Sequence, residues 1–107
     1  MSLVVILSDN QTLIKAWSHA LIRHYDILTA SSKSDCEAAS VVILDALKVD
    51  NDPSLTLLFN NRSIRFLIVG KDWSESKQIN ALVQGAAGYC GESEPPKLLL
   101  QAVDSVL

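Results

Sequence analysis

Three short apolar runs constrain the fold of this chain more than any other feature of its sequence. They are Leu3–Leu7, Val41–Leu44 and Phe66–Val69, and all three are rich in Val, Ile and Leu. Runs of this length without interspersed polar residues are typical of strands that are buried on both faces, as in the centre of a parallel sheet. The sequence therefore predicts a parallel sheet that is covered by helices on both sides.

Two further runs complete the predicted sheet. Asp26–Ala30 alternates in polarity, as expected of a half-exposed edge strand, and Ala86–Cys90 is the predicted fifth strand. Helical segments separate the strands: Gln11–Tyr25, a segment from Asn51-Asp52-Pro53 to Asn60-Asn61, a segment from a capping box at Asp72 and Glu75 through Val83, and a last helix that begins at Ser93–Pro96. Residues 32–39 have room for only about two turns, so we expect the second helix to be short or missing. This alternation predicts an α/β fold with right-handed crossovers.

The composition excludes several classes of protein. Because the chain has 107 residues, of which 49% are hydrophobic, we expect a single folded domain over residues 1–107. The net charge is −3 and the basic residues are scattered, which argues against a nucleic-acid-binding surface. No apolar stretch approaches the roughly 18–20 residues of a membrane span, and the first apolar run lacks the basic start of a signal peptide. Cys36 and Cys90 lack metal-ligand spacing, so we predict a reduced, cytoplasmic protein.

Polar residues that directly follow the predicted strands are the candidate functional residues. Asp9 and Asn10 follow the first strand, and Asp45 ends the apolar run of the third. In an open parallel sheet, ligands bind at the carboxyl ends of the strands, so we expect these three side chains to converge. Their oxygen atoms suit a hard cation such as Mg²⁺. The alternative is that they are ordinary solvated strand ends.

Five segments carry a resemblance to a known family when they are taken in order. They are "VVILSDNQTLIKAW", "SVVILDA", "IRFLIVGKD", "GAAGYCGE" and "EPPKLLLQAVDSVL". Together they resemble the receiver domain of response regulators, the phospho-acceptor module of two-component signalling, over essentially the whole chain. The resemblance implies a flavodoxin-like (βα)5 three-layer sandwich with a five-stranded parallel sheet in the order 2-1-3-4-5.

The resemblance also implies a role for each residue at the sheet edge. Asp45 would be the phospho-acceptor. Asp9 and Asn10 would hold Mg²⁺ together with Asp45 and the backbone carbonyl of Leu47. Tyr89 falls on the aromatic switch position of the family, three residues before its characteristic lysine.

Three positions depart from the family pattern. Asn10 replaces the second acid, so we expect Mg²⁺ to bind more weakly. Gly70 stands where the family has Ser or Thr, and it has no hydroxyl group with which to bind a phosphoryl group. Glu92 stands where the family has its lysine, and its charge opposes the neutralisation on which phosphoryl transfer depends.

We therefore predict a degenerate receiver, or pseudo-receiver, that is not an enzyme and in which phosphorylation of Asp45 is impaired. It would act through contact with proteins: a histidine kinase, an output domain, or a second copy of itself in a homodimer. The last helix and the strand of Tyr89 are the expected contact surface. Because "DNQTLI" is closest to family members with a helix-turn-helix output domain, the chain is a candidate regulatory part of a transcriptional regulator.

Three alternatives stay open on the sequence. The first is a competent, Mg²⁺-dependent receiver in which Asp45 accepts a phosphoryl group. The second is a flavodoxin-like module for a small ligand, although no glycine-rich phosphate loop follows the first strand. The third is a small enzyme, which the sequence disfavours because it shows no nucleophile–base pair.

Overall fold

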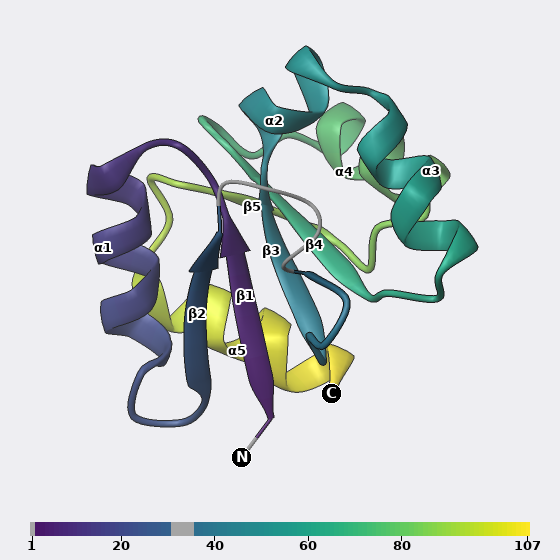
Figure 1. The fold of residues 1–107 in the computed structure, drawn as a ribbon. Coiled ribbons are helices and arrows are strands. Elements are labelled where there is room, and N and C mark those ends of the chain that lie inside the picture. The colour runs from purple at the N-terminus through teal and green to yellow at the C-terminus, as the bar shows by residue number, and fades with distance from the viewer. Residues whose placement is uncertain (1, 31–35) are drawn as a thin grey trace.

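A five-stranded parallel sheet forms the centre of the computed structural model, which describes residues 2–30 and 36–107 (Figure 1). The strands are β1 (Leu3–Leu7), β2 (Asp26–Ala30), β3 (Val41–Asp45), β4 (Phe66–Gly70) and β5 (Tyr89–Gly91). Their order in the sheet is β2-β1-β3-β4-β5, and every neighbouring pair is parallel. Both features confirm the predicted flavodoxin-like arrangement.

The burial of the strands follows their sequence pattern. All residues of β3 and β4 are buried, as are residues 4–7 of β1. Strand β2 lies at the edge of the sheet, and most of its residues are exposed or half-buried. The continuous apolar runs therefore form the centre of the sheet, and the alternating run forms its edge, as predicted.

Five helices surround the sheet in the described part of the chain. They are α1 (Gln11–Leu21), α2 (Ala46–Asn51), α3 (Ser54–Asn61), α4 (Glu75–Val83) and α5 (Pro96–Val106). Helices α1 and α5 cover one face of the sheet, where Trp17, Leu21, Leu99 and Val103 are buried. Leu100, Ala102 and Val106 of α5 pack partly against the same cluster. Most of the apolar surface of α5 is thus used inside the domain.

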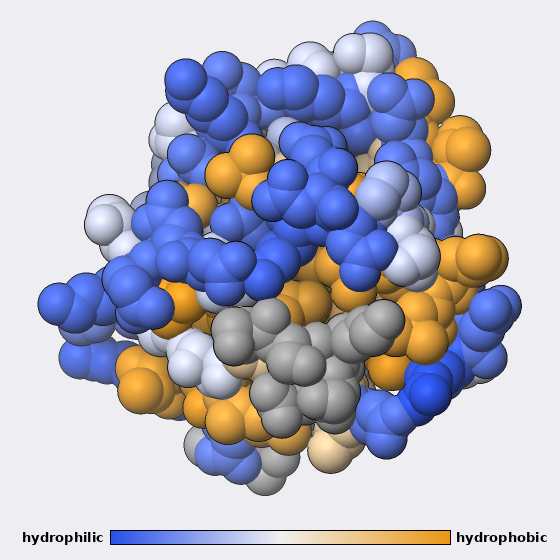
Figure 2. All heavy atoms as spheres, turned by 45° about the horizontal axis from the view of Figure 1, so that its top comes forward, coloured by the Kyte–Doolittle hydropathy of each residue, from blue (hydrophilic) through white to orange (hydrophobic). Residues whose placement is uncertain are grey.

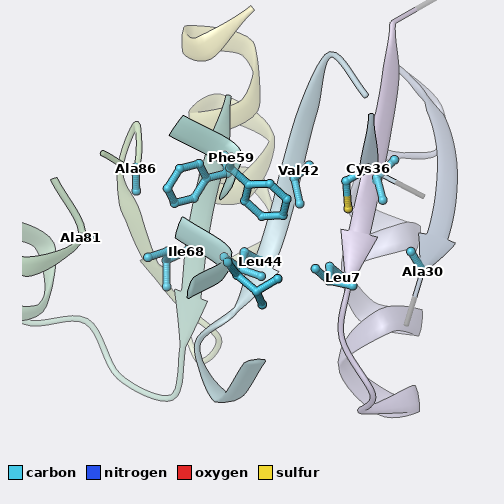
Figure 3. Packing of buried hydrophobic residues seen from close by; sticks show 12 residues of the cluster. Leu7, Ala30, Cys36, Val42, Leu44, Phe59, Ile68, Ala81 and Ala86 are labelled. Carbon is cyan, nitrogen blue, oxygen red and sulfur yellow. The ribbon is translucent and has the colours of Figure 1, made fainter. Parts of the chain in front are cut away.

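Helices α3 and α4 cover the opposite face. Phe59 of α3 is fully buried and its ring lies 5.5 Å, centroid to centroid, from that of Phe66. Figure 3 shows Phe59 beside Val42, Leu44 and Ile68 of the sheet. Burial of such aromatic and aliphatic side chains supplies most of the stabilising free energy of a domain of this size.

Three elements have predicted boundaries that are wrong by more than one residue. Helix α1 ends at Leu21 rather than Tyr25, because His24 N and Tyr25 N both donate to the carbonyl of Leu21 in a turn. The fifth strand begins at Tyr89 rather than Ala86, because the N–H of Ala86 donates to the carbonyl of Ala81 and thereby closes the end of α4. Gly85 makes this turn with a φ of 93°, which favours glycine. Helix α4 starts at Glu75 and is capped by Ser74, whose hydroxyl accepts a hydrogen bond from Lys77 N, so the predicted capping box at Asp72 is replaced.

Two segments between strands need separate mention. The sequence did not predict α2, a six-residue helix that begins directly after Asp45. The short second helix predicted for residues 32–39 falls partly outside the described residues. Residues 36–40, which are described, form a turn in which Ala39 N donates to the carbonyl of Cys36. Within residues 2–30 and 36–107, no helix has the length and apolar character needed to cross a membrane.

Candidate functional site

The carboxylate of Asp45 lies at the carboxyl end of β3 and is almost completely buried, with 4% of the residue exposed. Ser8 Oγ donates a hydrogen bond of 2.6 Å to its Oδ2, and Leu47 N donates one of 3.0 Å to its Oδ1. The second of these bonds caps the N-terminus of α2. Both oxygens of the predicted phospho-acceptor are therefore held by groups of the protein itself.

Ser8 connects the ends of β1 and β3, and sequence reasoning did not single it out. It is buried, and its hydroxyl also accepts a hydrogen bond of 3.0 Å from Asn10 N. Strands β1 and β3 pair with Leu7 beside Leu44, so the next residues, Ser8 and Asp45, also lie beside each other. The sequence did show a polar residue, Ser8, directly after the first strand. Its hydrogen bond to Asp45 could not be predicted, because it depends on the register of β1 and β3.

Asn10 serves as the N-cap of α1. Its Oδ1 accepts hydrogen bonds of 3.0 Å from Thr12 N and 3.2 Å from Leu13 N. Asn is among the preferred N-cap residues because its short side chain reaches the unpaired N–H groups of the first turn. The carbonyl oxygen that the sequence offered as a metal ligand is directed to the helix backbone.

Asp9 forms an ion pair that the sequence did not reveal. Its Oδ2 lies 2.7 Å from Nζ of Lys48, which is on α2, three residues after Asp45. The side chain of Asp9 is 70% exposed, whereas that of Lys48 is only 19% exposed. The sequence alone suggests that Lys48 is an ordinary solvated lysine. Helix α2, which the sequence did not predict, places it beside Asp9 at the carboxyl edge of the sheet.

Two of the three predicted departures from the family pattern, Gly70 and Glu92, lie next to each other. The N–H of Glu92 donates a hydrogen bond of 2.7 Å to the carbonyl of Gly70. Gly70 lies under the side chain of Tyr89, because a Cβ atom at position 70 would overlap the Tyr89 hydroxyl group. Burial raises the pKa of Tyr89, and the nearby Glu92, Asp72 and Asp50 raise it further. The phenol therefore fills the place that a side chain at position 70 would take.

A cavity of about 410 Å³ joins most of the predicted site residues. Asn10, Asp45, Gly70, Tyr89 and Glu92 all line it. Asp9 lines a neighbouring hollow of about 360 Å³ instead, with Asn10, Asp45, Leu47, Lys48 and Asn51. Figure 2, which turns the end of the molecule with α2 toward the viewer, shows hydrophilic side chains over most of this end. The structure thus brings the predicted residues to one edge of the sheet, in two adjoining hollows.

The donor set at this edge differs from that of a ready metal site. Among the described residues, no three His, Cys, Asp or Glu side chains lie close enough together to hold a metal ion. An amide oxygen used as a helix cap and a carboxylate paired with an ammonium group offer little to Mg²⁺, which requires near-ideal octahedral geometry. The arrangement fits an internal ammonium group better than a divalent cation.

The fold, in contrast to the sequence, has many solved counterparts. A response regulator from Thermotoga maritima is 14% identical and has a TM-score of 0.84, with 99% of this chain and 97% of that chain covered. DrrB, an OmpR/PhoB homolog from the same organism, is 20% identical with a TM-score of 0.79, over 97% of this chain and 51% of that one. An orphan response regulator of H. pylori is 18% identical with a TM-score of 0.74, over 99% and 96%.

No family model matches the sequence, and no curated protein matches it. The likeness to these structures is therefore one of fold: the chain has the fold of response-regulator receiver domains over almost its whole length. This confirms the resemblance that the five sequence segments carried.

Proposed function

We propose that residues 1–107 form one receiver-like domain of a response regulator in which phosphorylation of Asp45 is impaired. The observation that carries this proposal is that Asp45, Gly70 and Glu92 line one cavity. These two departures from the family pattern therefore share a cavity with the acceptor itself. Phosphoryl transfer depends on hydrogen-bond donors and positive charge around the transferred group. At this edge a glycine replaces a hydroxyl donor, and a carboxylate replaces an ammonium group.

The immediate surroundings of Asp45 support the same proposal. Its two oxygens each accept a hydrogen bond, from Ser8 and Leu47, and these bonds draw electron density from the nucleophile and restrict its orientation. The hydroxyl of Tyr89 covers Gly70, so the place of the hydroxyl-bearing side chain of the family pattern is already filled. Each feature raises the barrier to phosphoryl transfer, because the Asp45 oxygens and the Tyr89 hydroxyl are held in positions other than those the reaction requires.

We further propose that the domain acts in the cytoplasm through contact with proteins: a histidine kinase, an output domain or a second copy of the chain. DrrB, of which this chain covers 51%, illustrates a longer response regulator, so a regulatory part of a transcriptional regulator is one such arrangement. The last helix and the strand of Tyr89 were the expected contact surface. Spare apolar surface is more evident on α4, where Ile79, Leu82 and Val83 are 51%, 48% and 81% exposed.

Intact mass spectrometry tests the impaired phosphorylation. The protein is incubated with Mg²⁺ and a small-molecule phosphodonor, beside an Asp45→Asn variant and a receiver domain of known competence. We expect the added phosphoryl mass only in the competent receiver. Phosphoryl mass on this protein that disappears in Asp45→Asn would instead establish a competent Mg²⁺-dependent receiver.

A module for a small ligand is the second candidate, and the cavity of about 410 Å³ favours it, because ligand pockets span about 300–1,000 Å³. Its wall includes the apolar Val49, Ile68 and Ala81 beside the hydroxyl of Tyr89. A thermal-shift screen of small metabolites tests this candidate. A ligand that raises the melting temperature of the protein, but not that of a Gly70→Ser variant with altered packing of Tyr89, would support it.

A further inference from the structure

Asp9 and Asp45 form an acidic edge at the ends of β1 and β3. We infer that the ammonium group of Lys48 is the cation of this acidic edge and takes the place of a bound divalent metal ion. The inference rests on the hollow that Asp9, Asn10, Asp45, Leu47, Lys48 and Asn51 line. Lys48 Nζ lies 2.7 Å from Asp9 Oδ2 in this hollow. A distance of this size is typical of a charge-assisted hydrogen bond.

The placement of Lys48 is built into the fold rather than left to a mobile surface side chain. Asp45 ends β3 and caps α2, so α2 begins at the acidic edge and carries Lys48 within its first turn. The side chain of Lys48 is 19% exposed, which is low for a residue type that is usually solvated. Helix α2 and the end of β1 together therefore hold the ammonium group between them.

The other oxygens of the hollow are also engaged by protein donors. Asn10 Oδ1 accepts from the N–H groups of Thr12 and Leu13, and the Asp45 oxygens accept from Ser8 and Leu47. A divalent ion would have to displace the ammonium group and compete with these donors. It would also meet the positive charge of Lys48 at close range, and like charges repel strongly at short distance.

The consequence is an acidic edge at which Lys48, rather than an ion from solution, offsets the charge of Asp9. In such a domain the ends of β1 and β3 keep one arrangement at any concentration of Mg²⁺. This property goes beyond the proposed loss of phosphorylation, because it concerns cation binding by the unmodified domain. Cation binding is measured without a phosphodonor, so its outcome is separate from that of the mass-spectrometric test.

Titration with Mn²⁺, followed by calorimetry and by the electron paramagnetic resonance signal of the free ion, tests the inference on the chelator-treated protein. Lys48→Met removes the ammonium group from the hollow. Lys71→Met is the matched control, because it removes one positive charge from the neighbouring cavity, which Asp9 does not line. We expect Lys48→Met to bind Mn²⁺ about tenfold or more tightly than the wild type, and Lys71→Met to change the affinity far less.

Two further variants complete the design. Asp9→Asn in the Lys48→Met background is expected to abolish the gained affinity, since Asp9 is the carboxylate that loses its partner. Lys48→Gln serves if Lys48→Met fails to fold. The inference is overturned if the wild type binds Mn²⁺ as tightly as the Lys48 variants, or if the Lys48 and Lys71 variants gain affinity equally.

Discussion

The interior of the sheet is held together by apolar packing, whereas its carboxyl edge is held together by contacts between polar side chains. In the interior, residues 41–44 of β3 and 66–69 of β4 are buried and apolar, and they would suit many proteins with this fold. At the edge, Ser8, Asp45 and Asn10 are joined by hydrogen bonds, and Lys48 pairs with Asp9. Among the described residues, no buried side-chain nitrogen or oxygen lacks a hydrogen-bond partner.

This difference shows how a receiver fold is kept while the chemistry of its edge changes. The fold depends on the amount of apolar surface that the strands and helices bury, to which the exposed Glu92 adds little. The chemistry of the edge depends on the identity of single polar groups, and here those groups form hydrogen bonds and an ion pair with one another. The described polar groups at the ends of β1 and β3 therefore form a set of internal contacts.

Truncation of a core residue is the most severe test of the interior. Phe59 is fully buried against Phe66, so Phe59→Ala should lower the free energy of unfolding by about 3–5 kcal/mol. Leu57→Ala on the same helix is the control, since Leu57 is 62% exposed. Urea denaturation followed by circular dichroism gives both values. A loss below about 1 kcal/mol for Phe59→Ala would contradict the described packing of α3.

Restoring a hydroxyl at position 70 is the sharpest test of the edge. Because a Cβ atom there would overlap the hydroxyl of Tyr89, Gly70→Ser should force that ring to move, at about 1–2 kcal/mol of unfolding free energy. Gly88→Ser is the matched control, since a Cβ atom at position 88 meets only Leu67 Cδ2 at 3.4 Å. Urea denaturation and the nuclear magnetic resonance signals of the Tyr89 ring report the two effects. Equal stability of the two variants would show that Tyr89 does not depend on Gly70.

The interior could be predicted from the sequence far better than the edge. Apolar runs such as Val41–Leu44 identify buried strands directly, because burial on both faces permits few polar residues. The order of the strands came from the resemblance, and the structure confirms it. The predicted start of the fifth strand was wrong because Ala86, directly after the turn at Gly85, donates its N–H to Ala81 and ends α4 instead.

At the edge, the sequence indicated which residues lie there but not what they contact. The partner of Asp45 is Ser8, which follows from the register of β1 and β3. The partner of Asp9 is Lys48, which follows from the short helix α2. Both contacts depend on geometry between segments that lie far apart in the chain. The role of Asn10 as a helix cap was visible in the local sequence, but the metal-site interpretation took precedence over it.

The two roles of Asn10 can be separated by a pair of substitutions. Asn10→Ala removes the cap of α1 and should lower the free energy of unfolding by about 1 kcal/mol. Asn10→Asp keeps a capping oxygen and should cost much less, although it restores the second acid of the family pattern. Thermal and urea denaturation measure both variants. If Asn10→Asp destabilises the domain as much as Asn10→Ala does, capping of α1 does not account for the contribution of Asn10 to stability.

The pH dependence of stability at alkaline pH is the smallest expected effect, and it tests the packing of Tyr89 over Gly70. Burial raises the pKa of Tyr89 above its ordinary value of about 10, so the folded state favours the neutral phenol. The resulting stabilisation is complete below about pH 10 and is lost as the pH rises through the raised pKa of the folded state. Tyr89→Phe cannot ionise, so its free energy of unfolding should fall less steeply above about pH 10.

Tyr25 is the internal comparison for this measurement. Its hydrogen bond to Asp104 raises its pKa, with smaller contributions from burial and from the charge of Asp104. Tyr25→Phe should therefore remove a separate part of the decrease in unfolding free energy at alkaline pH and leave the part due to Tyr89 in place. Urea denaturation from pH 8 to 11 resolves the two parts, because all other side chains are common to the three proteins. Identical slopes for the wild type and Tyr89→Phe would mean that Tyr89 is hydrated rather than packed over Gly70, and the edge would then be more open than its contacts indicate.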